Sequence, residues 1–165
     1  MRSQDRPKFP KRVYTEDEVK TAKTLIDNGY KHHVTVRGST FFKQKVEKAI
    51  ALIKTAGYYD FFRTYIARVQ EIDGVTQLRQ SEASIWANDY AVENPVDAGS
   101  VFVQKASHMK EYLEGALYYG GQAEKRSAEK RIEFLEALKK KSLEKEVVAE
   151  CERLIKMWKD SALAY

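Results

Sequence analysis

The chain has 165 residues, of which 43% are hydrophobic and 32% are charged, and its formal net charge is +5. This length suits one well-filled core and is short for two. The sequence has no apolar run long enough to cross a bilayer, and its first twelve residues, MRSQDRPKFPKR, lack the apolar stretch of a signal peptide. We therefore expect one soluble, cytoplasmic domain with no membrane span, and export of a processed precursor is the alternative.

Most of the positive charge lies at the N-terminus. Residues 1–12 contain one acidic residue and five basic residues, which are Arg2, Arg6, Lys8, Lys11 and Arg12. The remainder of the chain is close to neutral, whereas DNA-binding folds usually concentrate basic charge on one face of the folded body. We expect residues 1–14 to form a basic, flexible arm and nucleic acid to be contacted, if at all, through this arm.

The first half of the chain shows clear helix and strand signals. TEDEVKTAKTLIDNG begins with a capping box of Thr15 and Glu18 and ends at Gly29, which predicts a helix. HHVTVRG alternates around Val34 and Val36 and predicts a short strand. STFFKQKVEKAIALIKTAG repeats the helical pattern. YYDFFRTYIARVQEIDG carries apolar residues at helical spacing and predicts a third helix over residues 58–72, with its aromatic side chains in the core.

The second half ends in long charged helices. Between residues 74 and 95 the periodicity fails, which indicates one or two short strands or an extended loop, with Trp86 and Tyr90 as anchors. Asp97 is a possible N-cap for the next helix. Two further helices are expected at about 121–140 and 143–159, forming a C-terminal hairpin that packs on its own domain. The predicted fold class is α+β, mostly α, with about six helices and a small sheet in a single domain over residues 15–165.

Few residues suggest chemistry by themselves. The usual phosphate-loop, dinucleotide, esterase and C-x-x-C motifs are absent from the sequence. His32 and His33 are adjacent at the start of a strand, so at most one faces any given site, and we expect a surface pair. His108 lies in the amphipathic stretch FVQKASHMKEYL, where Lys105 and His108 border the buried face. Both are expected to be half-buried, with His108 packed or hydrogen-bonded.

The order of these phrases resembles bacterial zincin-type metallopeptidase domains over roughly residues 20–140. The resemblance is carried by HVTVRGS, an F-x3-V-x2-A helix, the aromatic helix, SIWANDYAVENPVDAGSVFVQKASH and YYGGQAEKRSAEKRIEFLEAL. In that family a small sheet precedes an active-site helix bearing H-E-x-x-H, and a later helix supplies a third zinc ligand. The resemblance places Gln104-Lys105-Ala106-Ser107-His108 at the H-E-x-x-H positions and the third ligand on Glu124, with Glu129 as the alternative.

These departures from the motif imply that the reaction is lost. An amide is a poor zinc ligand in place of an imidazole, so Gln104, His108 and Glu124 would hold zinc weakly. Lys105 cannot accept a proton from zinc-bound water, and its charge repels a dication. We therefore expect a non-catalytic, zincin-like binding or structural module without a cofactor, with a protein or peptide in the former active-site cleft. Lys105 is expected to pair with Glu124 or Glu129 in place of the metal.

Two other functions stay open from the sequence. The first is an active zinc metallohydrolase with an atypical ligand set, in which His108 is joined by His32 or His33 and a carboxylate such as Glu124. The second is a helical protein unrelated to zincins that acts in assembly or contacts nucleic acid through its basic arm.

Overall fold

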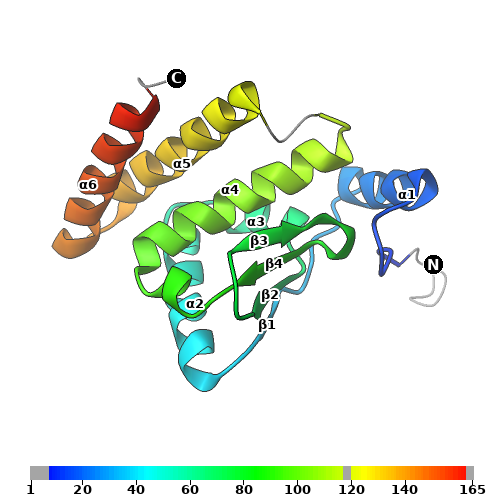
Figure 1. The fold of residues 1–165 in the computed structure, drawn as a ribbon, viewed down its shortest axis with the longest axis horizontal. Helices are drawn as coiled ribbons and strands as arrows, with labels where there is room; N and C mark the ends of the chain where they lie inside the picture. The colour runs from blue at the N-terminus through cyan, green and yellow to red at the C-terminus, as the bar shows by residue number, and fades with distance from the viewer. Residues whose placement is uncertain (1–7, 117–119, 163–165) are drawn as a thin grey trace.

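The computed structural model describes residues 8–116 and 120–162. Within these ranges the chain forms six α-helices and a four-stranded mixed sheet, as Figure 1 shows, so the predicted fold class is confirmed. No helix in the described ranges is long and apolar enough to cross a membrane.

Helices α1 and α2 begin where their capping residues predict. In α1 (Glu16–Asp27) the Thr15 side chain accepts a hydrogen bond from the Glu18 backbone, and the Glu18 carboxylate accepts one from the Thr15 backbone. In α2 (Thr40–Thr55) the Ser39 hydroxyl caps the first turn. Helix α2 buries Phe42, Val46, Ala49 and Ile53 on one face.

The third predicted helix is wrong in its second half. Helix α3 (Tyr59–Tyr65) ends after seven residues, and Arg68–Glu71 form strand β2. Ile66 already has extended backbone angles. The reason is that Ile66 and Val69 satisfy a helical spacing, while Arg68, Val69 and Gln70 also alternate outward and inward as a strand requires.

The sheet has two faces of opposite character. Strands β1 (Thr35–Arg37), β2 and β4 (Ser84–Ala87) are parallel, and β3 (Gln77–Arg79) pairs antiparallel with β4, in the order β1-β2-β4-β3. The register aligns the apolar residues Val36, Val69, Ile85 and Leu78 across the face that joins the core. It aligns polar residues in two rows across the other, outer face: Thr35, Arg68, Ser84 and Arg79 in one row, and Arg37, Gln70, Trp86 and Gln77 in the next.

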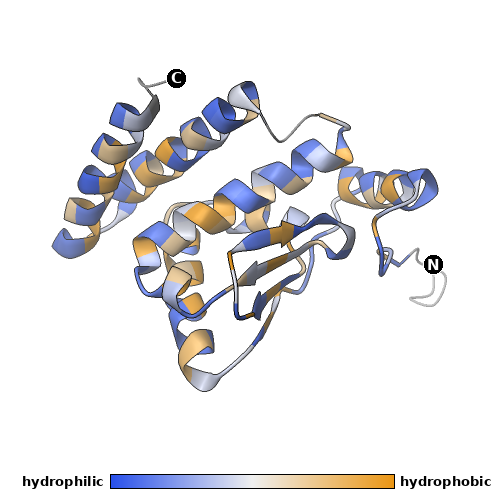
Figure 2. Ribbon diagram, in the orientation of Figure 1, coloured by the Kyte–Doolittle hydropathy of each residue, from blue (hydrophilic) through white to orange (hydrophobic). Residues whose placement is uncertain are grey.

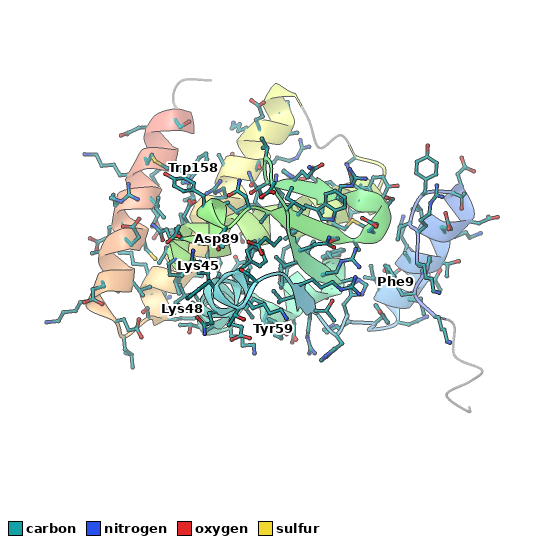
Figure 3. All side chains as sticks on the ribbon, turned by 60° about the horizontal axis from the view of Figure 1, so that its bottom comes forward. Phe9, Lys45, Lys48, Tyr59, Asp89 and Trp158 are labelled. Atoms are coloured by element: carbon teal, nitrogen blue, oxygen red, sulfur yellow. The ribbon has the colours of Figure 1, made fainter. Side chains whose placement is uncertain are left out.

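Two short 3-10 turns, η2 (Gln80–Glu82) and η3 (Tyr90–Val92), flank β4. Trp86 is half-buried, but Tyr90 is 86% exposed and is therefore not the anchor that the sequence suggested. Beside Tyr90, Asp89 accepts a hydrogen bond of 2.9 Å from Lys45 of α2, and Glu93 accepts a second one from the same ammonium group; Figure 3 labels Lys45 and Asp89. These ion pairs hold η3 against α2.

Helix α4 (Pro95–Leu113) lies at the centre of the molecule. Asn94, rather than Asp97, is its N-cap: the Asn94 side chain accepts hydrogen bonds from the backbones of Val96 and Asp97, and Pro95 occupies the first helical position. The helix contacts α2, α3, α5 and the edge strand β3. Its fully buried residues include Phe102, Val103, Ala106 and Met109, and the hydropathy colouring in Figure 2 shows apolar and polar segments alternating along it.

The last two helices form the expected hairpin. Helix α5 (Gly121–Lys141) packs on α4, α2 and α6 (Lys145–Ala162), and its Phe134, Leu135 and Leu138 are fully buried. The Phe134 ring lies beside Gly99 of α4, where a Cβ atom would come within 3.2 Å of the ring. The hairpin therefore packs on its own chain, as predicted.

The described part of the N-terminal segment is attached to the body. Val13 is fully buried, and its N–H donates a hydrogen bond of 2.7 Å to the Ser81 carbonyl, while Tyr112 Oη donates to the Val13 carbonyl. Phe9 stacks on Tyr30, with ring centroids 5.1 Å apart. Attachment thus begins before the boundary expected at residue 14, and Arg2 and Arg6 of the predicted arm lie outside the described residues.

Candidate functional site

Three side chains from two helices meet between α4 and α5. Gln104 and His108 lie one turn apart on α4, and Ser127 lies on the facing side of α5. Gln104 Nε2 donates a hydrogen bond to Ser127 Oγ, and His108 Nε2 lies 3.0 Å from the same oxygen. Because Gln104 already donates to this oxygen, the Ser127 hydroxyl can donate its hydrogen to the imidazole. We call Gln104, His108 and Ser127 the α4–α5 cluster.

The position facing Gln104 and His108 is Ser127, not the Glu124 that the resemblance implied. Glu124 and Glu129 are both exposed, whereas Ser127 is 8% exposed. Ala123, Ser127 and Arg131 follow one another at four-residue spacing along the buried side of α5. Glu124 lies in the first turn of this helix and is exposed, so the assignment of the third position to Glu124 is not supported by the geometry.

The surroundings of His108 favour its neutral form. Burial lowers its pKa from 6.5 to about 4, and the positive charges of Lys105 and Arg126 act in the same direction. A neutral imidazole accepts the Ser127 hydrogen without competition from a second proton on Nε2. Both Lys105 and His108 are half-buried, as the sequence predicted, and His108 is hydrogen-bonded.

Lys105 does not form the predicted salt bridge. Within the described ranges its ammonium group makes no ion pair with any carboxylate, Glu124 and Glu129 included. Burial lowers the pKa of Lys105, and the charge of Arg131 lowers it further. The predicted pairing is therefore wrong.

Ion pairs lie on both sides of the cluster along the same interface. One turn after Ser127, Arg131 is 7% exposed; it donates to Asp97 Oδ1 at 2.7 Å and to Ser100 Oγ at 3.1 Å. Its guanidinium lies over the ring of Trp158 from α6, 4.1 Å from the centroid, and Figure 3 labels Trp158. At the other end of the interface, Arg126 and Glu111 form an ion pair of 3.4 Å. Polar contacts therefore follow the length of the α4–α5 interface.

The atypical zinc ligand set is not assembled. His32 is 5% exposed and lies in an aromatic cluster with Phe9 and Tyr30, where Tyr30 Oη is 3.1 Å from His32 Nδ1. His33 is exposed, so the two histidines are not the surface pair that we expected. Across residues 8–116 and 120–162, no three His, Cys, Asp or Glu side chains group as metal ligands. His108 is thus joined by neither histidine.

A surface cleft of about 400 Å³ lies beside the cluster, on the outer side of the α4–α5 interface. It is lined by Ser107, Glu111, Arg126, Glu129, Lys130 and Glu133. Ser127 itself is buried, and its oxygen already accepts from Gln104, which disfavours a nucleophilic role. The cluster is therefore a satisfied hydrogen-bond network, and the adjoining cleft is the feature open to a ligand.

Sequence reasoning missed Ser127 because it searched α5 for a carboxylate. The sequence did contain a signal. Within the charged stretch EKRSAEKR, Ser127 and Ala128 are the two small residues, and both are buried. Of the predicted basic arm, Lys8, Lys11 and Arg12 are described and exposed, and they make no ion pair within the described residues.

Comparison of the chain with protein-family models, with curated proteins and with solved structures found no match.

Proposed function

We propose that this chain is a zincin-like domain that does not catalyse peptide hydrolysis and acts as a binding or structural module. The observation that carries the proposal is the meeting of Gln104, His108 and Ser127 at one hydroxyl oxygen. Two residues at i and i+4 on one helix and a third from a later helix are the arrangement in which a zinc ion takes three protein ligands. Helix α4 also contacts the small sheet through β3, as the resemblance requires.

The chemistry of these three positions is that of a hydrogen-bond network. A hydroxyl and an amide replace the ionised or imidazole ligands that zinc prefers, and the one imidazole is already engaged by Ser127. Lys105, at the position of the catalytic glutamate in the resemblance, adds a positive charge beside the site. The network holds α5 on α4, and the adjoining cleft is where a protein or peptide segment would bind.

The test is to restore the ligands. The triple variant Gln104→His, Lys105→Glu, Ser127→Glu is expected to bind one zinc ion per chain, measured by metal analysis after dialysis and by titration calorimetry. The matched control is the double variant Gln104→His, Lys105→Glu, which keeps Ser127 and has Glu124 as its carboxylate on α5. It is expected to bind zinc at least a hundredfold more weakly, because Glu124 is exposed in the first turn of α5, whereas Ser127 faces Gln104 and His108.

Three results would contradict the proposal. Stoichiometric, tight zinc in the unmodified protein would favour the metallohydrolase alternative. Tight zinc in the double variant would move the third position back to Glu124. A triple variant that folds, as judged by circular dichroism, yet binds no zinc would show that the three positions do not form a metal-site geometry.

A further inference from the structure

The outer face of the sheet carries concentrated positive charge. Its two rows contain Arg37 on β1, Arg68 on β2 and Arg79 on β3, and no acidic residue. Arg37 and Arg79 are exposed, and Arg68 is half-buried with Glu82 of η2 3.7 Å from its guanidinium. Three arginines against one nearby carboxylate leave this face positive. Adjacent strands lie about 4.8 Å apart, so the charges span the width of the sheet rather than one point.

An exposed cationic group lies at the β3 edge of the face. The guanidinium of Arg79 lies over the Trp86 ring, 4.3 Å from its centroid. The Arg79 side chain is exposed despite this contact, and a guanidinium plane is a group on which a nucleobase can stack. An acidic peptide has no planar aromatic group at each residue that could stack on the guanidinium in the same way.

The basic N-terminal segment joins the body beside this face. Val13 donates its hydrogen bond to Ser81, which lies in η2, directly after Arg79 and Gln80. Lys11 and Arg12 precede Val13 and are exposed. Lys11 and Arg12 therefore lie near the β3 end of the outer face, whereas the sequence alone located positive charge only in the arm.

We propose that the outer face of the sheet, together with the adjoining Lys11 and Arg12, binds single-stranded nucleic acid. The phosphates pair with Arg37, Arg68 and Arg79, and a base stacks on the Arg79 guanidinium. An open sheet face suits an extended strand, in which phosphates and unstacked bases follow one another, better than a small enclosed ligand. This surface is separate from the α4–α5 cluster and does not depend on the function proposed for it.

The experiment measures binding of the full chain to a fluorescein-labelled, mixed-sequence single-stranded RNA, and to DNA of the same sequence, by anisotropy at several salt concentrations. The test variant is Arg37→Gln/Arg79→Gln. The matched control, Lys125→Gln/Lys156→Gln, removes the same charge from exposed positions on α5 and α6. A third variant, Arg79→Lys, keeps the charge and removes the plane. A fourth changes all five basic arm residues to Gln. Thermal unfolding by circular dichroism confirms that each variant folds.

We expect the unmodified protein to bind and the test variant to bind at least tenfold more weakly. Its slope of log K against log salt should be smaller by about 1.4, since each lost phosphate contact on a single strand contributes about 0.7. The control should stay within about twofold of the unmodified protein. Arg79→Lys should keep the salt slope and still lose affinity. The relative affinity for RNA and DNA decides which nucleic acid is preferred.

Four results would overturn the proposal. The first is no binding by the unmodified protein. The second is equal affinity of the test variant and the control. The third is complete loss of binding in the arm variant with no effect of Arg37→Gln/Arg79→Gln, which would assign binding to the arm alone. The fourth is binding of poly-L-glutamate, or of vesicles of phosphatidylcholine with phosphatidylserine, as tightly as RNA.

Discussion

Arg131 of α5 donates a 2.7 Å hydrogen bond to Asp97 of α4, one helical turn from the α4–α5 cluster. Arg131 is almost completely buried, whereas the Asp97 side chain is 34% exposed. Burial lowers the pKa of Arg131, and Asp97 opposes that effect. The Asp97 carboxylate therefore offsets part of the free-energy cost of burying the Arg131 charge in the α4–α5 interface.

Removing the carboxylate of this pair should be costly. Asp97→Ala leaves the guanidinium buried beside Trp158 without its counter-charge, and we expect a loss of about 3 kcal/mol in the free energy of unfolding, measured with urea. The matched control is Asp60→Ala, which breaks the exposed pair with Arg63 and should cost less than about 1 kcal/mol. Equal effects of the two substitutions would mean that the buried pair contributes no more than a surface pair.

The stability of the fold should fall between pH 6.5 and 4. Burial lowers the pKa of His32 and of His108 to about 4 in the folded chain, while the unfolded chain titrates near 6.5. As the pH falls through this window the unfolded state binds protons that the folded state does not, so the free energy of unfolding decreases. Above pH 6.5 both states are neutral at these positions and the penalty is absent.

A substitution at His108 isolates its contribution to this pH dependence from that of His32. His108→Gln keeps a side chain able to hydrogen-bond Ser127 and does not titrate, so urea unfolding of this variant should show a shallower decline between pH 6.5 and 4. We expect a difference on the order of 2 kcal/mol at pH 4, reduced by the partial exposure of the ring. His33→Gln, at an exposed position, should leave the profile unchanged. A profile of His108→Gln identical to that of the unmodified protein would contradict the prediction.

Gly38 should be intolerant of a side chain. It has φ +154°, and a Cβ atom there would lie 2.7 Å from Glu71 Cβ and 2.8 Å from Phe42 Cδ1. We expect Gly38→Ala to lower the free energy of unfolding by about 2–4 kcal/mol, because backbone strain and a steric clash act together. Gly29→Ala also places alanine at positive φ, but in open space, and should cost about 1 kcal/mol. Similar losses of unfolding free energy in the two variants would mean that the steric clash at Gly38 does not contribute.

Cys151 should be unreactive in the folded protein. Its side chain is fully buried, and burial raises the pKa of the thiol to about 11. At pH 8 we expect the native chain to react with Ellman's reagent only at the rate of unfolding, and one thiol per chain to react at once in denaturant. Rapid reaction of the native protein would show that α6 separates from the helices it packs on, and exposes Cys151, at a low free-energy cost.

Much of the fold could be predicted because most helices carry their own boundaries in the sequence. The capping box of Thr15 and Glu18 and the apolar stripe of α2 are local patterns, and local patterns fix α1 and α2. The strand at Arg68–Glu71 could not be separated from α3 in this way, because no glycine or proline marks the change. Its alternation becomes decisive only when β1 and β4 pair on either side of it.

The candidate site was predicted on one helix and missed on the other. On α4, the spacing of Lys105 and His108 sufficed to predict their half-burial. On α5, the partner depended on which side of a highly charged helix faces inward, and a search for ligand chemistry selected Glu124 over Ser127. The burial of His32 depends on Phe9, more than twenty residues away in the chain, so adjacent histidines at a strand start gave no indication of it.

The two edge strands of the sheet affect whether the protein aggregates in concentrated solution. Its edge strands, β1 and β3, are each three residues long and each carries an exposed arginine. A neighbouring chain that tried to extend the sheet would find few backbone groups to pair with and would meet like charge from its own copy of the same edge. Short, cationic borders thus protect this small sheet against edge-to-edge aggregation.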